Sequence, residues 1–385
     1  MFQFNNKNVF IISFERWGEM KISKHHYAIE LARKNCNVFF IEAPLLSNKG
    51  VTIDVCDDHP NIKIVKYKPV YRAKRFLPHF IFSFLLKCQI KILLKTINVK
   101  PDIVWCFHGS LFENLKWFGA PVTIFFAADI LDRILPPEIY TADIVFGVSD
   151  TIVKQMEKTG KPVFQINHGL QKIFVENANQ LINSEIKDFV NHNVITVGYS
   201  GNLRMAALDK QTMIRVINNS PTIKFIFWGT YTKQGSNLGP GFEDGEVDIF
   251  IEFLENANNV QLRGAVSSEQ LQLEMKEVDM FWLCWNLKLS PHWDGSNSHK
   301  ILEYLSTGKP VVSHYVSSYK DYNLLYMLPS KDSNDYEFLF NKGIEKIKMG
   351  ELKADIMKRL SFAVDNSYEK QVSYIEEKIN SLSLL

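Results

Sequence analysis

Short apolar runs alternate with amphipathic segments along most of the chain. The runs are apolar on both faces, which is typical of strands in a parallel sheet covered by helices. In the first half they lie at residues 9–13, 38–41, 102–107, 122–126, 144–148 and 163–166. Helices are predicted over 23–34 and over 151–159, where Asp150 is a candidate N-cap and Gly160 ends the pattern. The first half therefore predicts a doubly wound α/β domain.

The alternation stops at a polar, Asn-rich stretch over 176–193 and then restarts. Strands are predicted at 194–199, 224–228, 260–263, 280–285 and 310–313, with helices at 208–218, 268–276 and 299–307. Two such arrays joined by a polar connection predict two Rossmann-like domains that face each other across a cleft. We place the domains at 1–185 and 194–365, followed by a C-terminal helix at 366–385 that can pack back on the first domain.

Length and composition agree with this division. A chain of 385 residues is long for one core and comfortable for two domains, and 46% hydrophobic against 22% charged residues leaves neither half disordered. The formal net charge is only +2, which argues against a dedicated nucleic-acid binder. Five cysteines without a CxxC pair fit a reducing compartment, and the N-terminus resembles a first strand rather than a signal peptide. We expect a cytoplasmic protein.

The segment 294–313, DGSNSHKILEYLSTGKPVVS, carries the most specific chemistry. Small residues over 295–298 let backbone N–H groups approach an anion at the start of a helix, whose dipole favours negative charge. Lys300 lies in the first turn and can neutralise a phosphate. Glu303 lies one turn further on, where it can accept hydrogen bonds from the vicinal hydroxyls of a ribose. The alternative interpretation is a solvated helix with an ordinary serine cap.

Five motifs, which follow one another along the chain as they do in the family, resemble the GT-B glycosyltransferases, especially family 4 and related group 1 enzymes that build bacterial surface polysaccharides. The resemblance is carried by SNSHKILEYLSTGKPVVS at 296–313, NVQLRGAVSSEQLQLEMKEVDMFWLCW at 259–285, VGYSGNL at 197–203, ADIVFGVSDTIVKQM at 142–156 and VFQINHGL at 163–170. It covers most of the chain and implies the GT-B fold.

Carried over to this sequence, the resemblance makes Glu303 the ribose ligand and Lys300 the motif lysine. Asn297 and Ser298 match the helix start that receives the diphosphate, and Gly201 the loop that approaches it. Arg204 and Lys210 lie near positions where relatives place cations on the diphosphate, with surface charge as the alternative role. Relatives often have a glutamate eight residues before the ribose ligand, where this chain has Gly295, so either Asp294 replaces it or that role is absent.

The first domain is expected to bind the acceptor. FFAADILD at 125–132 resembles a segment in which relatives place an aspartate near the acceptor, which makes Asp129 the candidate base or orienting carboxylate, with Asp132 in reserve. Capping the turn that follows is the alternative role for Asp129. Further candidates at strand ends or helix starts, each with a structural alternative, are His108, His25, His26 and His168.

A basic segment separates the first strands from the rest of this domain. Between residues 59 and 101 there is no acidic residue, and apolar and aromatic residues are interleaved with ten basic ones. The pattern predicts a basic amphipathic helix that contacts an anionic membrane through 63–100. The alternative is a core helix with a solvated lysine face.

Together these features predict a metal-independent glycosyltransferase with no cofactor. It would move a sugar from a UDP- or GDP-type donor to a saccharide or lipid-linked acceptor in cell-surface polysaccharide synthesis, in the cytoplasm or at the inner face of the membrane. Retention and inversion both remain open. A catalytically silent nucleotide-sugar-binding protein of the same fold is the alternative. A dehydrogenase is disfavoured because FERWGEMK, rather than GxGxxG, follows the first strand.

Overall fold

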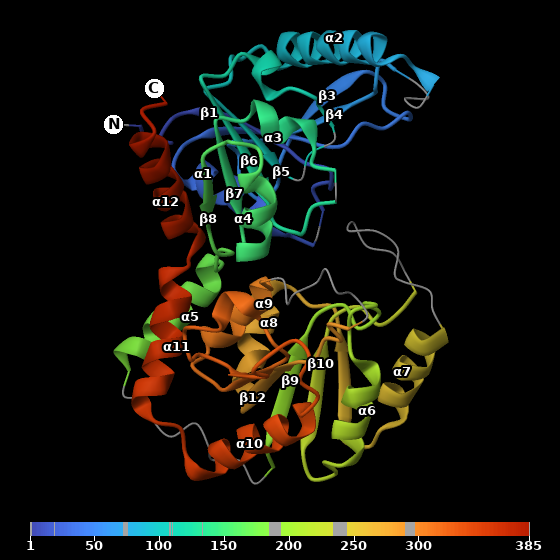
Figure 1. The fold of residues 1–385 in the computed structure, drawn as a ribbon, viewed down its shortest axis with the longest axis vertical. Helices are drawn as coiled ribbons and strands as arrows, with labels where there is room; N and C mark the ends of the chain where they lie inside the picture. The colour runs from blue at the N-terminus through green and yellow to red at the C-terminus, as the bar shows by residue number, and fades with distance from the viewer. Residues whose placement is uncertain are drawn as a thin grey trace. The chain divides into compact units, whose positions relative to one another are not determined.

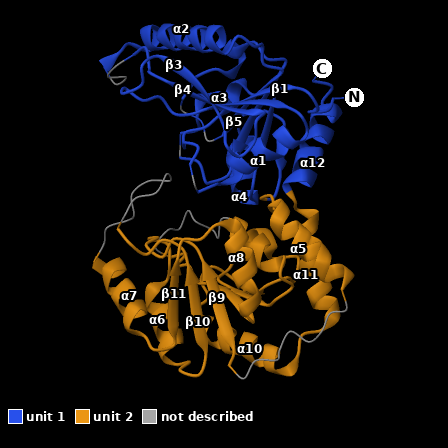
Figure 2. Ribbon diagram, turned by 180° about the vertical axis from the view of Figure 1, so that it is seen from behind, with its two compact units in different colours: residues 1–167, 368–385 blue, residues 168–367 orange. Residues whose placement is uncertain are grey.

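The computed structural model describes residues 2–18, 20–71, 76–107, 109, 111–132, 134–184, 194–233, 245–288 and 297–384. Two compact units divide the chain, and Figure 2 colours them separately. Unit 1 comprises residues 1–167 and 368–385, and unit 2 comprises residues 168–367. Each unit has its own hydrophobic core.

Unit 1 is built on an eight-stranded sheet with the order β3-β4-β2-β1-β5-β6-β7-β8. The strand pairs are parallel except β3 with β4. The strands are β1 (Asn8–Ile12), β2 (Asn37–Ile41), β3 (Val51–Val55), β4 (Ile62–Tyr67), β5 (Ile103–Phe107), β6 (Val122–Ala127), β7 (Ile144–Gly147) and β8 (Val163–Gln165). Its helices are α1 (Ser23–Arg33), α2 (His79–Ile97), α3 (Pro137–Thr141), α4 (Asp150–Glu157), α12 (Tyr368–Ser381) and the 3-10 turn η2 (Leu115–Phe118).

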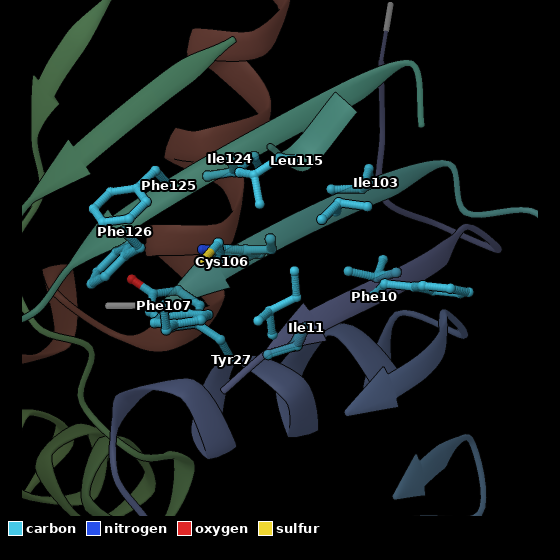
Figure 3. Packing of buried hydrophobic residues seen from close by; sticks show 14 of the residues in the cluster. Phe10, Ile11, Tyr27, Ile103, Cys106, Phe107, Leu115, Ile124, Phe125 and Phe126 are labelled. Atoms are coloured by element: carbon cyan, nitrogen blue, oxygen red, sulfur yellow. The ribbon is translucent and has the colours of Figure 1, made fainter. Parts of the chain in front are cut away.

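Aromatic side chains fill the core of unit 1. Tyr27 of α1 packs at a centroid distance of 5.3 Å from Phe126 and 5.9 Å from Phe107, so α1 covers the central strands β5 and β6 (Figure 3). Tyr368 at the start of α12 meets the same tyrosine edge-on at 4.9 Å. The last helix therefore returns to α1 and belongs to the first unit (Figures 1 and 2).

Unit 2 has a six-stranded parallel sheet with the order β11-β10-β9-β12-β13-β14. Its strands are β9 (Thr196–Ser200), β10 (Lys224–Trp228), β11 (Val260–Gly264), β12 (Met280–Leu283), β13 (Val311–Ser313) and β14 (Tyr326–Met327). Its helices are α5 (Lys172–Asn183), α6 (Lys210–Asn218), α7 (Gly245–Asn256), α8 (Ser268–Glu274), α9 (His299–Leu305), α10 (Tyr336–Met349), α11 (Lys353–Asp365) and the turns η3 (Met275–Glu277) and η4 (Ser317–Tyr319).

Helices cover both faces of this second sheet. Figure 1 shows α6 and α7 on one face and α8 and α9 on the other. On the second side, α11 packs on both α9 and α5. Such a three-layer arrangement explains why the strands are apolar on both faces.

The division of the chain differs in one respect from the sequence-based boundaries. The first unit ends at residue 167 rather than 185, because residues 172–183 form α5 instead of a polar joint. Only one side of α5 is apolar: Phe174 and Ala178 are buried, while its polar residues face outward. The Asn-rich exposed side of this helix resembles a polar linker in the sequence, because the sequence does not show which elements the apolar side packs against.

Candidate functional site

The unit 2 sheet reverses its winding between β9 and β12. These two strands are parallel neighbours, with Val197 opposite Met280 and Gly198 opposite Phe281. The chain leaves β9 toward β10 on one side, and leaves β12 toward β13 on the other. The loops after β9 and β12 therefore diverge, which is where doubly wound sheets bind their ligands.

Helix α9 is fixed to this point by Tyr304. The Tyr304 hydroxyl accepts a hydrogen bond from the Ser200 backbone N–H at 2.8 Å and lies 3.1 Å from the Ser200 hydroxyl. Its ring stacks on Phe281 of β12, with centroids 4.4 Å apart and planes 11° apart. One residue thus joins α9 to both strands that flank the reversal.

Lys300 and Glu303 lie next to this anchor, three residues apart on α9 and so on one helical face. Glu303 is 7% exposed and Lys300 is half-buried. The Lys300 side chain lies over the loop after β9: a Cβ added to Gly201 would meet its Cε at 2.5 Å and its Nζ at 3.1 Å. The lysine therefore lies at the carboxyl end of β9, and the glutamate follows one turn later on the same helical face.

Burial perturbs both groups. It raises the pKa of Glu303 to about 7, although the positive charge of Lys300 acts in the opposite direction. It lowers the pKa of Lys300, while the charge of Glu303 opposes that shift. A buried acid one turn from a half-buried base, both with shifted pKa values, is typical of a site that binds a polar ligand.

Two glycines allow the loops after β9 and β10 to approach each other closely beside Lys300. Gly201 has φ +149°, and Gly229, at the end of β10, has φ +130°. A Cβ on Gly229 would lie 1.9 Å from the Gly201 carbonyl oxygen, so a side chain cannot be accommodated there. The backbone of Gly201 is held by its N–H, which donates to the Trp228 carbonyl at 2.7 Å.

The start of α9 is only partly described. Asn297 and Ser298 are buried, and Ser298 is the N-cap residue, although its side chain does not cap the helix. Asp294 and Gly295 lie outside the described residues. The structure therefore does not describe the position where relatives have a glutamate eight residues before the ribose ligand.

The two further cations have structural partners. Arg204 is 2% exposed, and its Nη2 forms an ion pair with the Asp248 carboxylate of α7 at 2.7 Å, which Lys233 also contacts at 2.9 Å. Lys210 is buried, and its Nζ donates to the carbonyls of Ala206 and Leu208 at 3.4 and 3.5 Å. Neither matches the surface charge of the alternative interpretation.

In unit 1, Asp129 lies two residues after β6 with an exposed side chain, and Asp132 is exposed as well. The intervening Leu131 is held by Gln155 of α4, which contacts its backbone N–H and carbonyl, each at 3.2 Å. Among the described residues, no hydrogen bond or ion pair engages the Asp129 carboxylate. His108 lies outside the described residues.

His25 and His26 pack within unit 1. His25 accepts from the Ile22 N–H at 3.0 Å and contacts the Arg16 carbonyl at 3.1 Å, and burial lowers its pKa to about 4. Burial lowers the pKa of His26 to about 3, and its ring lies against Tyr368. These two histidines are therefore neutral structural groups.

His168 is buried at the start of unit 2. Its ring meets that of His299, the first residue of α9, at a centroid distance of 6.2 Å. His168 thus lies beside the helix that carries Lys300 and Glu303.

Sequence analysis missed two polar residues that directly follow strands. Glu42 after β2 is buried, accepts the Trp17 N–H at 2.8 Å, and has a pKa raised by burial. His314 after β13 stacks on Trp285 at 5.0 Å and lines a cavity of about 250 Å³. Both follow from the rule that ligands bind at the carboxyl ends of the strands in such sheets, which a search for polar residues at those positions would have applied.

Comparison with known proteins places the fold. The chain is similar to the sucrose-phosphate synthase of Thermosynechococcus elongatus (TM-score 0.64, 12% identity, 98% of this chain and 99% of that one). It is also similar to Anabaena HepE in complex with UDP and glucose (TM-score 0.61, 13% identity, 97% of this chain and 100% of that one). A third similar structure is an E. coli trehalose-6-phosphate structure bound with UDP-2-fluoro glucose (TM-score 0.64, 9% identity, 98% of this chain and 99% of that one). No family model and no curated protein matches the sequence.

The chain has the GT-B fold, in which two parallel-sheet α/β units follow one another. The fold class predicted from the alternation of strands and helices is therefore confirmed. The resemblance to GT-B glycosyltransferases is confirmed at the same level.

Proposed function

We propose that this protein is a glycosyltransferase that uses a nucleoside-diphosphate sugar as donor. The observation that carries the proposal is the pair of half-buried Lys300 and buried Glu303, on the helix that Tyr304 attaches at the winding reversal of the unit 2 sheet. The Lys300 side chain lies over Gly201. In this proposal unit 2 binds the donor and unit 1 binds the acceptor.

The two groups of the pair suit the two polar parts of such a donor. An ionised Glu303 accepts hydrogen bonds from the two vicinal hydroxyls of a ribose. These hydrogen bonds replace those that the carboxylate would make to water if it were exposed. The Lys300 ammonium lies beside the Gly201 backbone and compensates charge on the diphosphate. We propose a donor of the UDP or GDP type. The UDP in the HepE structure and the UDP-2-fluoro glucose in the E. coli structure support the UDP type.

The proposed reaction needs positioning and charge compensation more than covalent chemistry. An acceptor hydroxyl oxygen bonds to the anomeric carbon of the donor sugar, whose bond to the diphosphate oxygen breaks. The electron pair leaves with the nucleoside diphosphate, which Lys300 stabilises. The hydroxyl proton passes to a base, for which we assign Asp129, since its carboxylate is exposed and its segment is held by Gln155. We propose that these groups act without a metal ion.

For the acceptor we propose a saccharide or lipid-linked saccharide of cell-surface polysaccharide synthesis, used at the inner face of the membrane. The acid-free basic segment over 59–101 supports this location.

Turnover against a panel of UDP-, GDP-, CMP- and dTDP-sugars tests the proposal, with release of the nucleoside diphosphate as the signal. We expect release from one donor class, stimulated by saccharide or lipid-linked acceptors. Asp129→Asn is expected to lower kcat at least about 100-fold with little change in donor affinity. Donor binding without turnover on any acceptor would instead favour the silent nucleotide-sugar-binding protein.

A further inference from the structure

Helix α2 exposes a stripe that is aromatic at one end and basic at the other. Phe80 and Phe84 are 74% and 64% exposed, and Phe76, just before the helix, is 79% exposed. The exposed lysines 87, 91 and 95 continue the same side at helical spacing. Figures 1 and 2 show α2 along the outside of unit 1, with no other described helix or strand of this unit over its outer face.

The opposite side of α2 already supplies what the fold needs. Phe82, Leu86, Ile90 and Leu93 are buried in the core of unit 1, and the helix packs on β3 and η2. The exposed phenylalanines therefore do not serve as core residues. Three large aromatic side chains this exposed along one edge are uncommon on a protein surface without a partner.

Charge near the stripe is positive. The carboxylate of Glu113 contacts the His79 ring at 3.2 Å and accepts a hydrogen bond from the Ser83 hydroxyl, both on α2. The Lys87 ammonium lies over the Trp117 ring, 4.7 Å from its centre, and the Lys87 side chain is exposed. No acidic residue occurs in the sequence from 59 to 101.

We propose that this face of α2 docks on an anionic lipid bilayer, with Phe76, Phe80 and Phe84 inserted at the headgroup level and the lysines against lipid phosphates. Phenylalanine on one part of a face and lysine on the other is typical of interfacial helices. A protein partner fits less well, because lysine is depleted at the centre of protein interfaces. Among the described helices none is long and apolar enough to span a bilayer.

Docking deepens the proposed function, on which it rests only for the identity of the acceptor. A transferase held at a bilayer by unit 1, the proposed acceptor unit, meets acceptors that the bilayer carries. The inference therefore selects the lipid-linked acceptor over the free saccharide.

Vesicle flotation of the full chain tests docking without any nucleotide present. We expect binding to phosphatidylcholine vesicles containing about one-third phosphatidylglycerol, and much weaker binding to pure phosphatidylcholine. Phe76→Ser/Phe80→Ser/Phe84→Ser and Lys87→Glu/Lys91→Glu/Lys95→Glu are each expected to weaken binding to anionic vesicles at least about tenfold. Lys342→Glu/Lys346→Glu/Lys348→Glu on α10 makes the same change of net charge and is expected to bind almost as wild type does.

Two further readouts keep the outcomes distinct. Melting temperature and donor affinity of each α2 variant are expected to match wild type, which separates loss of docking from loss of fold. Equal vesicle binding by wild type and both α2 variants would overturn the inference. So would a dimer that the phenylalanine variant dissociates while neither form binds vesicles. Docking without turnover would contradict the proposed function and leave docking standing.

Discussion

Tyr304→Phe tests whether α9 is attached to the sheet in the way the structure describes. The substitution keeps the ring that stacks on Phe281 and removes only the hydroxyl. Ser200 is 5% exposed, so its N–H would lose the acceptor at 2.8 Å and gain no water in exchange. An unsatisfied buried donor costs about 1–3 kcal/mol, and the lost contact with the Ser200 hydroxyl adds to this. We expect unit 2 to lose about 2 kcal/mol of stability.

For a unit of this size, that loss corresponds to about 4–8 °C in melting temperature. Calorimetry measures the shift, and amide hydrogen exchange in peptides from β9 and α9 locates it. Tyr322→Phe is the matched control in the same unit: that side chain is half-exposed, its ring packs against Phe362, and the change is expected to cost less than about 0.5 kcal/mol. Equal melting of the two variants, with unchanged exchange at β9, would refute the proposed attachment of α9.

Two further predictions concern the Lys300–Glu303 site, and a third concerns the buried Glu42 of unit 1. Affinity for a UDP-sugar, measured by calorimetric titration, is expected to rise from about pH 6 to pH 8. The reason is that the ribose favours ionised Glu303, whose pKa is about 7. Glu303→Gln should remove this pH dependence. Gly201→Ala is expected to weaken donor binding about tenfold by displacing Lys300, whereas Gly350→Ala, which has φ +84° but open space around it, should leave donor affinity unchanged. Glu42→Ala removes the acceptor for a backbone N–H in the loop after β1, and thermal unfolding should show a loss of about 1–3 kcal/mol.

Local pattern was enough to predict the architecture and the position of α9. Apolar runs of strand length and the helix over 299–305 follow from residues that are close in sequence. The position of Lys300 and Glu303 on one helical face follows from the same periodicity.

What sequence alone did not reveal depends on contacts between distant residues. Arg204 is paired with Asp248, 44 residues away, and no local signal connects them. The division of the chain at residue 167 depends on α5 packing against α11, nearly 180 residues further along. The position of His25 at the start of a helix predicts a histidine that can face a ligand. In the structure its ring nitrogens contact the Arg16 carbonyl and the Ile22 N–H.

Calorimetric titration of the preferred nucleotide sugar into Glu303→Ala tests the central claim most directly. Hydrogen bonds from two hydroxyls to a buried carboxylate contribute about 2 kcal/mol or more, so we expect affinity to fall at least about 30-fold. Glu345→Ala, an exposed glutamate on α10 of the same unit, should bind as wild type does. If Glu303→Ala bound the donor with wild-type affinity, α9 would not be the donor site.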